Sequence, residues 1–275
     1  MGTILEYDFM RRAFVVGILL AVIIPCVGII VVLKRLSMIG DALSHTSLAG
    51  VTAGLVMSIN PILGSVAACI IAALSIEAIR KKIPKYAEMS IAIIMSAGVG
   101  LAGVLSGFVK NSANFNSFLF GSIVAISNFE MALVVLISSA VMLTFFLLYK
   151  ELFYIALDER SARLAGIPVK TINFIFTILT AVTVSVAART VGALIVSSLM
   201  VIPVACAMQF GKSYRQTVVY SIVFAVFFMI SGLYVSYYER LKPGGTIVLI
   251  GVICLVAILS IKSVAASIML TKRKV

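Results

Sequence analysis

The sequence predicts an all-α polytopic membrane protein, and three observations lead to that fold class. Of the 275 residues, 62% are hydrophobic and only 12% are charged, and the mean hydropathy of +1.21 is far above that of a soluble globular domain. Apolar runs of about 17 to 22 residues recur along the chain, and each can cross a hydrocarbon layer roughly 30 Å thick. No intervening stretch is long enough for a soluble domain, so we expect one transmembrane domain over residues 1–275.

Hydropathy predicts about nine spans. They are expected near residues 13–33, 41–59, 62–79, 89–108, 126–149, 171–188, 191–209, 217–237 and 245–262. Asn60-Pro61 could instead be a break between two half-depth segments, which would give eight spans. The pairs Gly50/Gly54 and Gly103/Gly107 have the spacing that lets membrane helices approach closely, so we expect them to be packing positions.

The basic residues predict the orientation of the chain. If successive connections alternate sides, six of the 22 Lys and Arg residues fall on one side and the remaining 16 on the other. By the positive-inside rule, the N-terminus is expected outside and the C-terminus in the cytoplasm. The net charge of +12 is then explained by orientation and by attraction to the anionic lipid bilayer, and no nucleic-acid partner is implied. The six outside residues are Arg11, Arg12, Lys110, Arg189, Arg240 and Lys242.

Several enzyme classes are excluded by missing residues. The chain has one histidine, so it cannot form the two-histidine zinc protease motif. Phe210–Ser213 resembles the end of a phosphate-binding loop, but Cys206 stands where the first glycine is required. No glycine pattern of a nucleophile elbow surrounds any serine. We therefore expect no catalysis by this chain.

The connection between Lys150 and Lys170 contains a short amphipathic helix, expected from Leu157 to Leu164. Asp158 and Glu159 favour its N-terminal end, Gly166 ends it, and Pro168 opens the next segment. A helix of this kind can dock on a partner, or it can lie on the lipid surface.

Four separated motifs resemble the permease subunit of bacterial ABC importers for divalent metal ions, the zinc and manganese uptake family. They are GDALSHTSLAGV (Gly40–Val51), LDERSARLAG (Leu157–Gly166), VGALIVSSLMVIP (Val191–Pro203), and Ser236–Tyr238 together with Pro243–Gly245. The motifs occur in order over about 210 residues, so the resemblance covers nearly the whole chain.

The resemblance implies a type II ABC importer-like permease in the inner, cytoplasmic membrane of a bacterial cell. It implies a homodimer that works with cytoplasmic ATPase subunits and an extracytoplasmic metal-binding protein, and no resident cofactor. Glu239 and Arg240, at the outer end of a span, either contact the metal-binding protein or form a solvated loop. The family's coupling helix, which contacts the ATPase, matches the segment from Leu157 to Gly166. This match implies ATPase-coupling roles for Leu157, Asp158, Glu159, Arg160, Arg163, Leu164 and Gly166.

The family's metal path maps onto Asp41 and His45. An i, i+4 pair lies on one helix face, so both side chains can point together into a pore. Carboxylate and imidazole ligands suit zinc and, less selectively, manganese or iron. The alternative is that Asp41 caps a helix while His45 makes a buried hydrogen bond.

The segment His45–Gly50 resembles zinc-type members more than manganese-type members, so zinc is the expected cargo. A manganese or iron importer of the same family is the alternative. A stand-alone metal channel or secondary carrier is a further alternative, but carriers usually need ionisable relays on several spans.

Overall fold

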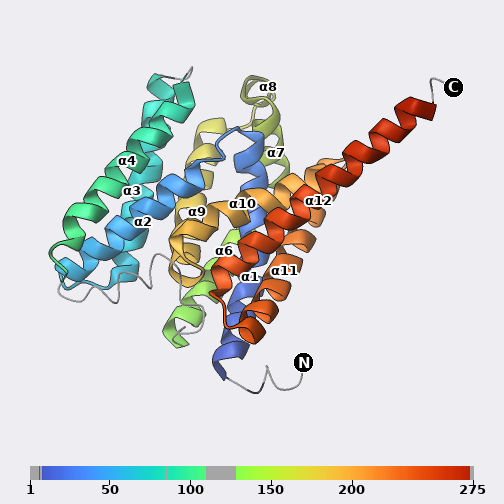
Figure 1. Ribbon diagram of the computed structural model, residues 1–275. Helices are drawn as coiled ribbons and strands as arrows, with labels where there is room; N and C mark the ends of the chain where they lie inside the picture. Colours follow the sequence, from blue (N-terminus) through green and yellow to red (C-terminus); the bar gives the residue numbers. More distant parts are fainter. Residues whose placement is uncertain (1–5, 7, 84–85, 110–127, 273–275) are drawn as a thin grey trace.

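The computed structural model describes residues 6, 8–83, 86–109 and 128–272 of the chain (Figure 1). Within these ranges the secondary structure is helical and contains no strand, which confirms the predicted fold class. The helices are α1 (Asp8–Leu33), α2 (Ile39–Val56), α3 (Pro61–Lys82), α4 (Ala87–Ser106), α6 (Asn128–Leu147), α7 (Tyr149–Leu157), α8 (Glu159–Leu164), α9 (Val169–Thr190), α10 (Ala193–Met208), α11 (Tyr214–Glu239) and α12 (Pro243–Lys272).

Helix α1 lies in the middle of the bundle and is mostly buried. It packs against α6, α9, α10 and α11, whereas α2, α3 and α4 form a group that joins the bundle through α9 and α10 (Figure 1). The start of α1 and the α11–α12 connection lie at one end of the molecule, which we call the N-terminal end (Figure 1). Helix α8 and the C-terminal end of α12 lie at the opposite end, which we call the α8 end (Figure 1).

Seven helices in the described ranges are long and apolar enough to cross a membrane, namely α1, α3, α4, α6, α9, α11 and α12. The expectation of nine spans is therefore too high by this criterion. The two other expected spans, 41–59 and 191–209, correspond to α2 and α10. Helix α10 has 16 residues, or about 24 Å at 1.5 Å per residue, which is shorter than the hydrocarbon layer. Helix α2 contains Asp41, His45 and four hydroxyl side chains, which lower its hydropathy.

Asn60-Pro61 marks the boundary between two helices. Pro61 is the first residue of α3, and the Asn60 side chain accepts a hydrogen bond from the Ile62 amide at 2.9 Å. This is the preferred chemistry of a helix start, with an asparagine cap followed by proline. Because α3 has 22 residues and qualifies as a full span, the alternative of two half-depth segments is wrong.

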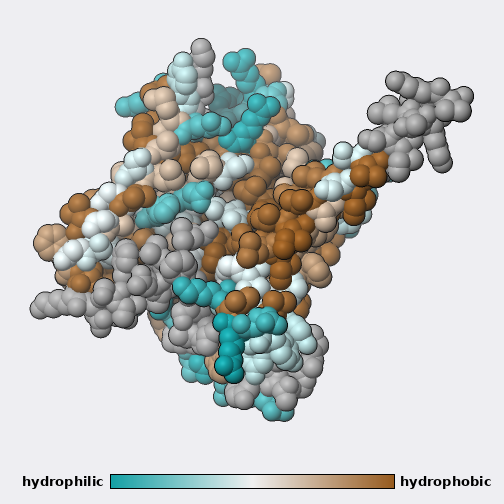
Figure 2. Space-filling view, in the orientation of Figure 1, coloured by the Kyte–Doolittle hydropathy of each residue, from teal (hydrophilic) through white to brown (hydrophobic). Residues whose placement is uncertain are grey.

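The outer surface matches an environment of lipid with polar ends. In Figure 2, hydrophobic side chains cover much of α12 between the two ends, and hydrophilic side chains gather near α8 and near the N-terminal end. Large apolar side chains on α4, α6, α11 and α12 are exposed. A contiguous apolar surface of this kind indicates contact with lipid or with another protein.

Four basic residues used in the orientation argument, Lys85, Lys110, Arg273 and Lys274, lie outside the described residues.

Candidate functional site

Helix α2 carries the candidate metal ligands and is held close to α3 by glycine. A Cβ atom added at Gly50 would lie 2.4 Å from the carbonyl oxygen of Gly64 and 2.7 Å from Cβ of Ala68. A Cβ atom at Gly54 would lie 3.0 Å from Cα of Pro61. The prediction that Gly50 and Gly54 are packing positions is therefore confirmed, and only glycine allows this separation of the two helices.

The second predicted glycine pair, Gly103/Gly107 on α4, behaves differently. A Cβ atom at Gly103 would meet no atom within 4 Å, and one at Gly107 would be 3.5 Å from the Val104 carbonyl oxygen of its own helix. Within the described part of this single chain, neither glycine is a close packing position, so that prediction is wrong here.

Asp41 and His45 occupy the accessible face of α2. Between Ile39 and Thr52 every residue of the helix is buried except these two, which are partly exposed. Since residues four apart are neighbours on one helix face, the carboxylate and the imidazole lie on the same, partly exposed face of α2. The structure thus brings together the two metal ligands expected from the sequence.

Asp41 is fixed by a residue far away in the chain. The hydroxyl Oγ of Ser197, on α10, donates a hydrogen bond to Asp41 Oδ1 at 2.5 Å. The two backbones are close because Gly40 faces α10, where an added Cβ would lie 3.1 Å from Cα of Ser197. A hydroxyl bound to an ionised carboxylate forms a short, strong hydrogen bond, which orients Asp41 and leaves its second oxygen available for another partner.

The alternative roles for Asp41 and His45 are not found in the described residues. The N-cap of α2 is Met38, which makes no side-chain capping bond, and Asp41 lies three residues further along. The His45 ring has no hydrogen-bond partner among the residues that the structure describes. The capping role is therefore contradicted.

No group of three or more His, Cys, Asp and Glu residues that could hold a metal ion occurs in the described ranges. Zinc is usually four-coordinate, so two ligands from one chain leave positions for water or for a second copy of the chain.

Hydrogen bonds between serine hydroxyls connect α2 to α3 and α3 to α9. Ser47 and Ser65 of α3 are hydrogen-bonded at 2.8 Å, and Ser65 and Ser185 of α9 at 3.1 Å. The hydroxyl of Ser44 is buried and has no partner among the described residues. Interhelical hydroxyl bonds of this type join helices where the surroundings are apolar.

The sequence did not predict these serine contacts, although it contained one signal for Ser197. Ser197 lies within the quoted motif Val191–Pro203, where two adjacent serines interrupt an apolar run. The spacing in the sequence gives no indication that Ser197 would meet Asp41, 156 positions away.

Helix α8 agrees closely with the short amphipathic helix expected from Leu157 to Leu164, apart from its first residue. Asp158 is the N-cap and accepts hydrogen bonds from the amides of Arg160 and Ser161 and from the Ser161 hydroxyl. These bonds, led by the one from the hydroxyl, lower the pKa of the Asp158 carboxyl. Leu157 belongs to α7, because the extended backbone of Asp158 separates the two helices.

The remaining predicted features of α8 are present as expected. Gly166 has a φ of +82°, the left-handed conformation that favours glycine after a helix. Glu159 and Arg163 form an ion pair at 3.3 Å on the exposed side. Leu164 is 89% exposed, whereas Ala162 is buried against the rest of the protein.

Glu239 and Arg240 lie at the N-terminal end, at the α11–α12 connection (Figure 1). Both are exposed, and Arg240 ends α11 in the left-handed conformation with a φ of +53°. Next to them, the hydroxyl of Ser236 donates to the Leu241 carbonyl at 2.6 Å and fixes the turn. The structure therefore places this pair and α8 at opposite ends of the molecule.

An ion pair that the sequence did not reveal joins α6 to α9. Arg189 Nη2 and Glu130 Oε1 are 2.8 Å apart, and Glu130 is 9% exposed. Arg189 also lines a small cavity beside Ser47 and Val51 of α2. The pair thus links α6 to the helix that packs beside the site.

Together the fold and the site define a polytopic membrane protein with a carboxylate and an imidazole on a mostly buried helix. The chain belongs to the ABC 3 transport family, whose pattern matches residues 6–262, and this confirms the resemblance noted in the motifs. It is 34% identical over 262 residues to a "Probable metal transport system membrane protein" of Treponema pallidum, covering 94% of this chain and 98% of that protein.

Two further relatives carry names with different metals. The "Manganese transport system membrane protein MntC" of Listeria monocytogenes is 30% identical and covers 91% of this chain and 89% of its own length. The "High-affinity zinc uptake system membrane protein ZnuB" of Haemophilus influenzae is 28% identical, with 88% and 94% covered.

A solved structure shares the fold. "PsaBC from Streptococcus pneumoniae in complex with Fab" aligns with a TM-score of 0.84 at 24% identity, covering 94% of this chain and 93% of that chain.

Proposed function

We propose that this protein is the permease subunit of an ATP-driven importer of divalent metal ions. The observation that carries the proposal is the face of α2, where Asp41 and His45 are the accessible residues of an otherwise buried stretch. Ionisable side chains within a membrane domain are functional by default, because placing them there is costly. The names of the Treponema, Listeria and Haemophilus relatives support metal ions as the cargo.

The metal would bind between Asp41 and His45 during its passage. Ser197 orients one carboxylate oxygen of Asp41, and the other oxygen can bind the ion. In a homodimer with the two sites near the twofold axis, each chain would contribute two ligands and the pair would provide four.

Zinc is the proposed cargo, with manganese or iron as the alternative. The ligands themselves do not decide, since most nitrogen and oxygen sites bind zinc more tightly than manganese. The segment His45–Gly50 favours zinc, while relatives named for manganese and for zinc are about equally similar to this chain. Selectivity would then reside in the protein that delivers the ion.

The energy would come from a cytoplasmic ATPase that contacts α8. The exposed Leu164 and the charged side chains of α8 would form that contact, and the α8 end would face the cytoplasm. The N-terminal end, with Glu239 and Arg240, would face an extracytoplasmic metal-binding protein. This orientation agrees with the distribution of basic residues and with a bacterial cytoplasmic membrane.

The test is uptake of radioactive zinc and manganese into proteoliposomes that contain the chain, its ATPase and its metal-binding protein. The proposal predicts uptake that requires ATP and stops when the ATPase is made catalytically inactive. The metal that accumulates identifies the cargo. Uptake that continues with the inactive ATPase would contradict the proposal and support a channel or carrier.

A further inference from the structure

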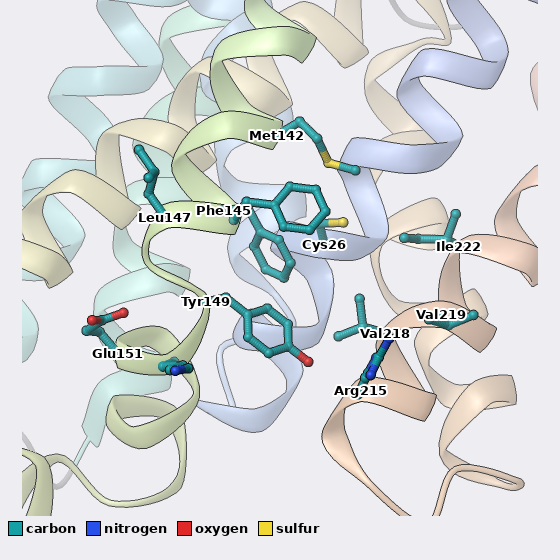
Figure 3. A pocket seen from close by; sticks show the side chains of 12 residues that line it. Cys26, Met142, Phe145, Leu147, Tyr149, Glu151, Arg215, Val218, Val219 and Ile222 are labelled. Atoms are coloured by element: carbon teal, nitrogen blue, oxygen red, sulfur yellow. The ribbon is translucent and has the colours of Figure 1, made fainter.

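A lateral groove lies away from α2, between α1, α6, α7 and α11. Its volume is about 770 Å³, within the range of ligand-binding cavities in proteins. The walls are formed by apolar side chains of α6 and α11, with Cys26 of α1 at the base, as Figure 3 shows. None of the residues proposed for metal transport lines this groove.

The groove opens toward the side of the molecule where lipid is expected. Phe146, Leu147 and Val219 line it and are themselves 67%, 71% and 49% exposed. They belong to α6 and α11, which are both apolar enough to span a membrane. A molecule in the groove would therefore enter from the bilayer.

The groove changes from apolar to basic toward one end. Helix α6 runs toward α7 and the α8 end, whereas α11 starts from the α8 end, so both reach that end of the groove. There the lining consists of Tyr149, Lys150, Glu151 and Arg215. Ile222 lies about 10 Å deeper than Arg215 along α11, at 1.5 Å per residue. The groove therefore has an apolar wall and charged side chains at its α8 end, which we call its mouth.

The charges at the mouth favour an anion. Lys150 and Arg215 are exposed, and both line this end of the groove. In Figure 3 Tyr149 lies between Glu151 and Arg215, with its hydroxyl directed toward the Arg215 side and Glu151 on the far side. The acidic side chain is thus separated from Arg215, and a phosphate group beside Arg215 would not meet it.

We propose that this groove binds an anionic glycerophospholipid, with an acyl chain along the apolar wall and its phosphate beside Lys150 and Arg215. An acyl chain matches the elongated apolar lining, and the headgroup charge is complementary to the two basic side chains at the depth where the helices leave the membrane. The lipid would contact α1, α6 and α11 and stabilise their packing near the start of α7, the helix that leads into α8. This inference does not depend on the identity of the cargo.

The absence of tryptophan from the sequence allows a direct test. A single tryptophan is introduced by Phe146→Trp, at a position that lines the groove, and by Phe227→Trp, at an exposed position of α11 outside it. Each protein is placed in bilayers of phosphatidylcholine with a small fraction of lipid brominated in its acyl chains, since bromine quenches tryptophan fluorescence on contact. The brominated lipid is either phosphatidylglycerol or phosphatidylcholine.

If the groove binds an anionic lipid, brominated phosphatidylglycerol should quench the fluorescence of Phe146→Trp more strongly than brominated phosphatidylcholine does. The preference should be about fivefold for each basic side chain that contacts the headgroup. At Phe227→Trp the two brominated lipids should quench equally. Combining Phe146→Trp with Lys150→Gln and Arg215→Gln should abolish the preference, whereas the charge-matched control Arg160→Gln with Lys170→Gln should retain it.

Three outcomes would overturn the proposal. Equal quenching by both lipids at Phe146→Trp would show ordinary contact with bulk lipid. Quenching weaker than at Phe227→Trp with both lipids would show that a protein surface, such as a second copy of the chain, covers the groove. A preference that survives Lys150→Gln with Arg215→Gln would place the headgroup elsewhere.

Discussion

Replacing Gly50 with alanine should separate α2 from α3 and destabilise the protein. The added Cβ would lie 2.4 Å from the Gly64 carbonyl oxygen and 2.7 Å from the Ala68 Cβ. Both contacts are shorter than Cβ atoms tolerate, and the closer partner is backbone, so the two helices must move apart by at least about half an ångström. Overpacking of this size costs about 1–3 kcal/mol, and the higher helix propensity of alanine offsets up to about 1 kcal/mol of it.

The assay is the free energy of unfolding of the purified chain in mixed micelles, followed by circular dichroism during titration with denaturing detergent. Gly103→Ala is the matched control, because it makes the same change in a helix where the added Cβ meets no atom within 4 Å. We expect Gly50→Ala to lose stability and Gly103→Ala to be unchanged or slightly more stable. Equal stability of the two variants would refute the packing argument.

Two further predictions concern the α8 end. Lys34 donates to the Asn173 side chain at 2.6 Å, and its burial, followed by the charge of Arg80, lowers the pKa of Lys34 from near 10.5 to about 8. Between these pH values the unfolded chain binds more protons than the folded chain, so the stability of the folded protein should rise from pH 8 to 10.5. The melting temperature should show this rise in the original protein and not in Lys34→Met. The same rise in both proteins would contradict the lowered pKa of Lys34. Exchange of Asp158 and Glu159 for lysine should abolish metal uptake while ATP hydrolysis continues. The control Asp8→Lys, at the N-terminal end, should leave metal uptake intact. Normal coupling of uptake to ATP hydrolysis in the α8 variant would favour a helix that lies on lipid.

The sequence was sufficient where local chemistry determines the structure. Asp158, Gly166 and Pro168 mark the limits of α8 and the start of α9, because capping and left-handed glycine act within a few residues. Leu157 was assigned to the wrong helix, since both α7 and α8 are helical on either side of Asp158 and apolar periodicity does not reveal the break. The long spans were found because their length is set by the bilayer.

The sequence was insufficient where distant helices meet. Ser197 and Asp41 are 156 positions apart, and Ser65 and Ser185 are 120 positions apart. A helix that is apolar on all sides carries little pattern to show which face meets which neighbour. The spacing of Asp41 and His45 indicates their shared face on α2, but the contact of that face with Ser197 of α10 is visible only once the helices are packed.

The same limit applies to the groove beside α7. Its lining comes from four helices, and Lys150 and Arg215 are separated by 65 positions in the chain. In the sequence each looks like an ordinary basic residue at the end of a span, where such residues are common.

A metal path past Asp41 and His45 can be tested by measuring ATP-dependent uptake of zinc and manganese by Asp41→Asn and His45→Gln. Both changes preserve side-chain size, and assembly with the ATPase and basal ATP hydrolysis are checked first. Glu88→Gln, an exposed acidic position on α4, serves as the control. We predict that both α2 variants assemble and hydrolyse ATP but lose at least about tenfold of metal uptake, as expected when a ligand or its immediate partner is removed. Full uptake by both variants, at the level of Glu88→Gln, would contradict a metal path along this face of α2.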